Sequence, residues 1–66
     1  MGELLATDAK ALLAKHGYHR AEVYEVEAEG PDTEILFVLN GEARMAAVRI
    51  IDKKETIAVV SGWPVL

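Results

Sequence analysis

The sequence contains no cysteine and no long run of apolar residues. Without cysteine, the chain forms neither a disulfide framework nor a cysteine-ligated zinc site. No apolar run reaches the roughly 20 residues that a membrane-spanning helix requires. The opening residues, MGELLATDAK, combine no basic segment with a long apolar stretch, so no secretory signal is predicted. We therefore expect a cytoplasmic protein without a membrane partner.

Basic residues are also few, with 7 Lys and Arg against 11 Asp and Glu and a net charge of −4. Because nucleic-acid binding needs a basic surface against the phosphates, no nucleic-acid partner is expected. A hydrophobic content of 52% is too high for a disordered chain, and 66 residues correspond to one domain, residues 1–66. A domain of this size buries only about 60% of its unfolded surface. It therefore needs a bound metal, a very well packed core or a second copy for stability.

The N-terminal segment has apolar residues at helical spacing, which predicts an amphipathic helix. Its apolar face consists of Leu5, Ala9, Leu12, Leu13 and His16. Two starts are compatible with the pattern: Thr7 is the N-cap with Asp8 in the first turn, or the helix begins as early as Gly2 and includes Thr7. Gly17 follows the last periodic residue and is predicted to end the helix.

Beyond the predicted helix the apolar period changes to two, which predicts four antiparallel strands. The predicted strands are 19–29, 35–39, 42–51 and 56–61. The central turn residues between them are predicted to be Pro31-Asp32, Asn40-Gly41 and Lys53-Lys54. One helix followed by a four-stranded meander is an α+β fold, αββββ, similar at the level of architecture to the cystatin-like roll.

The three predicted turns give registers that agree on one apolar face, because cross-strand partners share a face. This face consists of Tyr24, Val26, Ala28, Ile35, Phe37, Leu39, Ala46, Val48, Ile50, Ile57 and Val59. Trp63 has the same parity and is expected to cap this core. We expect the single helix to cover this face, since its apolar side chains need a partner layer.

The opposite face of the predicted sheet also has an apolar centre, and one helix cannot cover both faces. The predicted interface residues on it are Leu36, Val38, Met45, Ala47, Arg49 and Val60. An exposed apolar centre with a charged rim marks an interaction surface. We predict a face-to-face homodimer in which Arg49 pairs with a glutamate of the second chain. The alternatives are another protein partner, a cover formed by the chain's own C-terminal tail, or an uncovered face on which small residues such as the alanines tolerate water.

Two polar groups are further candidates. His16, His19 and Arg20 form a possible ligand site, because histidine titrates near neutral pH and often binds metals. A structural role is favoured for them, since a helix C-terminus disfavours anions. The alternating row of Glu25, Glu27 and Glu29 is interpreted as a solvated, charged strand edge in preference to a site for a cation or basic partner.

Few residues suggest catalysis: Ser61 is the lone serine, and the five glycines form no phosphate-binding loop. No catalytic residue, cofactor or metal site is predicted. The leading hypothesis is a non-enzymatic protein-interaction or regulatory module that acts as a homodimer. The alternative is a small-molecule-binding protein or minimal enzyme with a pocket between subunits and His16, His19 or Arg20 at its mouth. A third is a toxin-type protein related to nucleic acid.

The third hypothesis comes from the segment AKALLAKHGYHR, which resembles the opening helix of HicA-type RNA-cleaving toxins. Those toxins carry a Gly-Ser-His-type motif on a later strand and end in a second helix. Here His19 comes too early, at the start of the first predicted strand, and no such motif follows, so the resemblance transfers no active residue. The helix followed by VYEVEAE is also similar to PepSY-type inhibitory domains, which are usually exported. Neither family is adopted.

Overall fold

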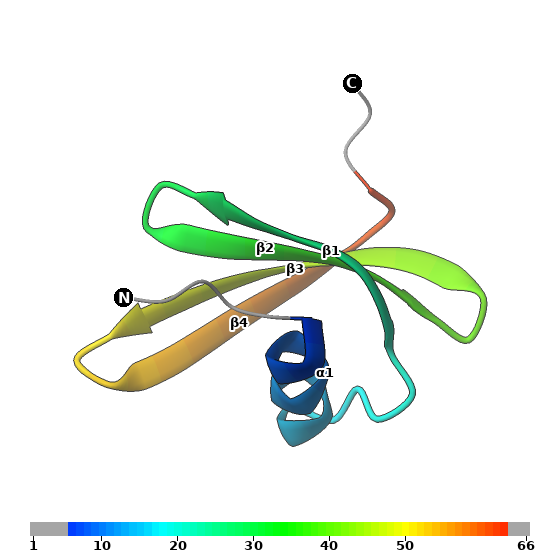
Figure 1. The fold of residues 1–66 in the computed structure, drawn as a ribbon, viewed down its shortest axis with the longest axis horizontal. Helices are drawn as coiled ribbons and strands as arrows, with labels where there is room; N and C mark the ends of the chain where they lie inside the picture. Colours follow the sequence, from blue (N-terminus) through cyan, green and yellow to red (C-terminus); the bar gives the residue numbers. More distant parts are fainter. Residues whose placement is uncertain (1–5, 64–66) are drawn as a thin grey trace.

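The computed structural model describes residues 6–63, which form one helix and a single four-stranded sheet. The elements are α1 (Ala6–Lys15), β1 (Glu22–Glu29), β2 (Asp32–Leu39), β3 (Glu42–Ile51) and β4 (Lys54–Ser61). The strands are antiparallel and lie in the order β1-β2-β3-β4, and α1 lies on one side of the sheet (Figure 1). The predicted α+β fold, αββββ, is confirmed.

The helix ends as the sequence predicts. Gly17 has a φ of 100°, and its N–H donates to the carbonyl of Ala14 at 3.0 Å. The N–H of Tyr18 donates to the carbonyl of Leu13 at 2.8 Å, which completes a Schellman motif. At the other end, Thr7 lies within α1, in agreement with the earlier of the two predicted starts. The predicted helical positions before residue 6 lie outside the described residues.

The core lies between α1 and the middle of the sheet. Its buried hydrophobic residues are Ala9, Leu12, Leu13, Ala21, Ile35, Phe37, Ala46 and Val48. Tyr18, just after the helix, packs its ring edge-on against Phe37, with ring centroids 6.0 Å apart. The predicted core face is therefore the face that α1 covers, and its centre on β2 and β3 is fully buried.

The Asn40-Gly41 hairpin has the predicted register, with Leu39 opposite Glu42 and Phe37 opposite Arg44. Both turn residues have positive φ, 54° for Asn40 and 78° for Gly41, as a type I′ turn requires.

The other two turns each lie one residue earlier than predicted. The β3–β4 turn is Asp52-Lys53, with φ values of 51° and 64°, and Ile51 therefore pairs with Lys54. This placement puts Asp, which tolerates left-handed backbone, at the first central position. The β1–β2 turn is Gly30-Pro31, with the positive φ at Gly30, as in a type II′ turn. Both registers shift by two residues, so side chains on either side of the turns keep their predicted faces.

A β-bulge in β1 changes the position of Tyr24. Val23 pairs with Phe37, whereas Glu25 pairs with the adjacent Leu36, so Tyr24 is the extra residue. Val23 therefore packs against the core, and Tyr24 is 65% exposed. The prediction that Tyr24 belongs to the core is wrong.

Trp63 does not cap the core either. Gly62, with a φ of 82°, turns the chain, and residues 62–63, drawn in orange-red after β4, turn away from α1 (Figure 1). The indole Nε1–H of Trp63 donates to the carbonyls of Arg44 at 2.8 Å and Phe37 at 3.2 Å. Its ring lies against Tyr24, with centroids 5.4 Å apart. Trp63 and Tyr24 thus form an aromatic pair outside the core.

Between residues 6 and 63, no helix has both the length and the apolar character needed to cross a lipid bilayer.

Candidate functional site

The face of the sheet that points away from α1, here called the open face, has an apolar centre. The registers and the alternation of side chains place on it Leu36, Val38, Ala43, Met45, Ala47, Ile51, Ala58 and Val60. Met45 pairs with Leu36 on one side and with Val60 on the other, which gives a continuous apolar row across β2, β3 and β4. The five apolar residues predicted for the interface therefore lie together on one face.

These side chains are substantially accessible. Leu36, Val38, Met45 and Ala47 are half-buried, and Val60 is 50% exposed. Trp63 contacts Tyr24 and hydrogen-bonds at the β2–β3 pair of Phe37 and Arg44. The rest of the C-terminal tail, the alternative cover for this face, lies outside the described residues.

The β1 side of the open face is acidic. Glu25, Glu27 and Glu29 follow one another along β1, and Glu34 lies opposite Glu27 on β2. Carboxylate oxygens of Glu27, Glu29 and Glu34 lie within 4.8 Å of one another. The hydrogen bond with Glu25 and the repulsion from its charge raise the pKa of Glu27. None of the ion pairs within residues 6–63 involves these four glutamates.

Carboxylates at this spacing suit a hard cation or a positively charged protein surface. The glutamates of β1 are exposed, and side chains on a solvated strand commonly carry such charges without binding an ion. The β1 edge of the open face is therefore negatively charged.

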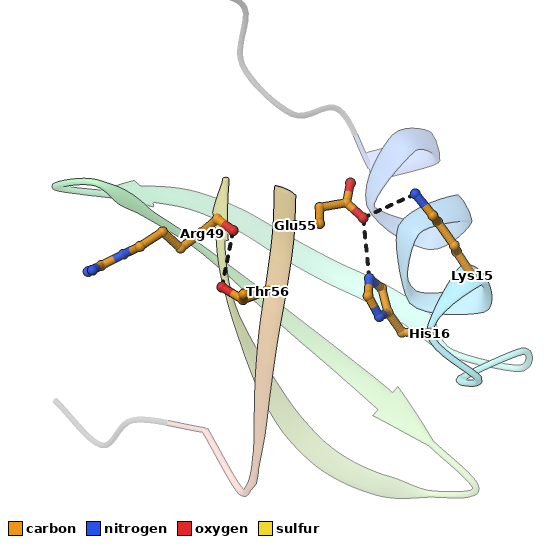
Figure 2. Close-up of polar contacts among 5 residues, drawn as sticks. All are labelled: Lys15, His16, Arg49, Glu55 and Thr56. Carbon is orange, nitrogen blue, oxygen red and sulfur yellow. Dashed lines mark hydrogen bonds and ion pairs between the residues drawn. The ribbon is translucent and has the colours of Figure 1, made fainter. Parts of the chain in front are cut away.

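Arg49 also lies on the open face, but its partner is in its own chain. The Arg49 Nε donates to the Asp32 Oδ1 at 2.7 Å, and a second guanidinium nitrogen donates to Oδ2 at 3.3 Å. This hydrogen bond and the charge of Asp32 raise the pKa of Arg49. In Figure 2 the Arg49 side chain points away from α1, while Thr56 donates a hydrogen bond to the Arg49 carbonyl at 3.2 Å. Within the single chain Arg49 thus forms a bidentate pair with Asp32, and its pairing with a glutamate of a second chain stays a prediction.

The polar cluster at the end of α1 lies on the other face. His16 Nε2 and Lys15 Nζ each lie 3.3 Å from the Oε1 of Glu55, which β4 directs toward the helix (Figure 2). These two hydrogen bonds lower the pKa of Glu55, and the bond with His16 has the larger effect. The arrangement fastens the C-terminal end of α1 to β4.

His16 is therefore engaged in a structural contact. His19 and Arg20 are exposed in the turn between α1 and β1, and within residues 6–63 neither forms a side-chain hydrogen bond or an ion pair. The structure does not join the three residues into one site. Sequence reasoning missed Glu55. Its one signal was its place next to the predicted β3–β4 turn, with a side-chain parity that puts the carboxylate on the face covered by the helix.

A shallow hollow, open to solvent, lies beside the β3–β4 turn. It is lined by Ile51, Asp52, Lys54 and Thr56. Small-molecule sites usually enclose most of the ligand surface, which this hollow does not do.

Comparisons with known proteins add no relative: no family model, no curated protein and no solved structure matches this chain. The resemblances of the helix to HicA-type toxins and to PepSY-type domains thus gain no support. The guides to function are the fold and the chemistry of its surfaces.

Proposed function

We propose that this protein is a small non-enzymatic interaction module that acts as a homodimer through its open face. The observation that carries the proposal is the apolar row of Leu36, Met45 and Val60, which crosses three strands on the side away from α1. Contiguous accessible apolar surface of this kind favours association with another protein surface. A second copy is the simplest partner, because two-fold dimers dominate among soluble oligomers.

The size of the open face supports this proposal. Strands about 4.8 Å apart, with about eight residues rising roughly 3.3 Å each, give a four-stranded face of roughly 500 Å². Two such faces in contact bury about 1,000 Å², which is the lower end of specific interfaces. Burial of the second side of the sheet also supplies the additional hydrophobic stabilisation that a domain of 66 residues needs.

The two alternatives fit the molecule less well. A ligand pocket between subunits with His16 at its mouth would need His16 on the open face, whereas His16 contacts Glu55 on the helix side. A nucleic-acid function would bring phosphates against the acidic row of Glu25, Glu27 and Glu29, which repels them.

The test compares two exposed apolar residues on opposite faces of the sheet. Val60 lies on the open face and is 50% exposed, whereas Ile50 lies on the helix side and is 62% exposed. Because both side chains reach solvent, Val60→Asp and Ile50→Asp are expected to fold. Sedimentation velocity at micromolar concentration should show a dimer for the natural protein and for Ile50→Asp, and a monomer for Val60→Asp.

Leu36→Asp and Val38→Asp should dissociate the dimer as well, with circular dichroism as a control for folding because these side chains are half-buried. A natural protein that stays monomeric at this concentration would contradict the homodimer. A dimer that survives Val60→Asp would place the interface elsewhere, for example at the free edge of β1 or β4.

A further inference from the structure

We infer that the two copies are related by a two-fold axis parallel to the strands, so that the acidic β1 edge of one copy lies over β4 of the other. This inference rests on the homodimer proposed above and assigns the arrangement of its two sheets.

Symmetry leaves two main arrangements. Sheets that pack face to face in an aligned manner keep their strands within about 30° of each other. A two-fold axis that lies between two such sheets is then nearly parallel or nearly perpendicular to the strands. Since the strand order is β1-β2-β3-β4, the parallel axis places β1 over β4 and β2 over β3. The perpendicular axis places each strand over its own copy.

Charge distinguishes the two arrangements. On the open face β1 contributes Glu25, Glu27 and Glu29, and each of these carboxylates is exposed. A perpendicular axis would bring this row against the same row of the second copy, and like charges in direct opposition disfavour an interface. Within one chain, a hydrogen bond with Glu25 and then the repulsion from its charge already raise the pKa of Glu27.

The open side of β4 is complementary to that row. Lys54, Thr56, Ala58 and Val60 alternate there with residues that face α1, so β4 offers one cation and no acid to the interface. The β1–β2 and β3–β4 turns lie at the same end of the meander, and Lys54 is therefore at the same end as Glu29. Rotation about an axis parallel to the strands preserves position along them. The rows of paired residues put Glu29 level with Thr56, so Glu29 of one copy lies over Thr56 of the second copy, twice per dimer. Lys54 lies about 7 Å farther along the strand, within reach of its long side chain.

The apolar centre fits the same arrangement. The axis passes between β2 and β3, where Leu36 and Met45 pair. Leu36 of one copy therefore lies over Met45 of the other at the centre of the interface, while the Glu29 and Lys54 side chains lie at its rim. An apolar centre with a charged rim is the usual composition of a protein interface.

Charge reversal tests the arrangement. In sedimentation equilibrium at low salt, Lys54→Glu and Glu29→Lys should each raise the dimer Kd about tenfold, because each places like charges together at two symmetric positions. The double variant Glu29→Lys/Lys54→Glu should return to nearly the natural Kd. With a perpendicular axis, Glu29→Lys would instead lower the Kd, because it would place a lysine over the glutamate row, and that result would overturn the inference.

A cross-linking experiment provides a second measurement. The natural sequence has no cysteine, and Glu27 and Ala58 lie at the same level of the sheet, in a row that runs through Glu34 and Ala47. With a bismaleimide linker of about 10 Å, the spacing of packed sheets, a mixture of Glu27→Cys and Ala58→Cys should give a covalent heterodimer. Either variant alone should stay largely uncross-linked.

The two proposals fail in different ways. Efficient cross-linking of Glu27→Cys to itself, in a protein that sediments as a dimer, would overturn the axis but leave the homodimer intact. Absence of both the sedimenting dimer and the mixed cross-link would overturn the homodimer, and the axis with it.

Discussion

Glu55 shows how a single side chain fixes the helix on the sheet. Its Oε1 accepts hydrogen bonds from Lys15 and His16 at 3.3 Å each, and the side chain is 25% exposed. The predicted register put Glu55 beside the turn and opposite Asp52. The sequence did not indicate how far α1 extends over β4. Only the observed register, in which Glu55 pairs with Ile50, brings the carboxylate beneath the end of the helix.

The contribution of Glu55 should depend on pH. Its contacts lower its pKa from the ordinary value of 4.5, so the carboxylate stabilises the fold above that value. As the pH falls through the lowered pKa of the folded state, this stabilisation is lost. In thermal unfolding, Glu55→Gln should therefore lower the Tm at neutral pH and change it much less at about pH 3.

Glu42→Gln is the matched control for that experiment. Glu42 pairs with Arg44 at 3.0 Å, but its side chain is 70% exposed and joins no separate element. Its replacement should change the Tm little at either pH. An equal loss of Tm at both pH values for Glu55→Gln would contradict the electrostatic role of this carboxylate.

The secondary-structure elements could be predicted to the extent that local residues specify them. Asn40-Gly41 gave the correct register because few other residue pairs accept two positive φ values. Asp52, Lys53 and Lys54 are all polar, so composition could not decide which two occupy the turn. The bulge at Tyr24 had no signal at all, since Val23 and Tyr24 are both apolar and either could face the core.

The β3–β4 turn yields a direct test of the observed register. Lys53 has a φ of 64°, a conformation that costs a residue with a side chain roughly 1–2 kcal/mol. Lys53→Gly should therefore raise the free energy of unfolding in urea by about 1 kcal/mol. Lys54→Gly, one residue later and within β4, should lower it by about 0.5–1 kcal/mol. A rise in the free energy of unfolding for Lys54→Gly as well would indicate the Lys53-Lys54 turn instead.

At the scale of the whole molecule, the predicted faces of the candidate-site residues are correct although two of the three predicted registers are wrong. Both shifts were by two residues, so Leu36, Met45 and Val60 kept the face that their parity predicted. Trp63 did not follow prediction, since the turn at Gly62 redirects the chain, and the sequence did not indicate Asp32 as an intrachain partner of Arg49. The apolar pattern thus predicts which side chains share a face, whereas tail direction and ion pairs depend on tertiary distances.

A homodimer also makes stability depend on protein concentration, because folding and association are then coupled by mass action. A tenfold rise in concentration adds about 1.4 kcal/mol to the stability of the dimer, which corresponds to about 3 to 6 °C in Tm for a pair of small domains. Differential scanning calorimetry over a hundredfold range of concentration should show this rise for the natural protein and for Ile50→Asp. Val60→Asp should unfold at a lower and concentration-independent Tm, because its exposed carboxylate opposes burial of the open face. A constant Tm for the natural protein would show that the folded chain is stable without a second copy.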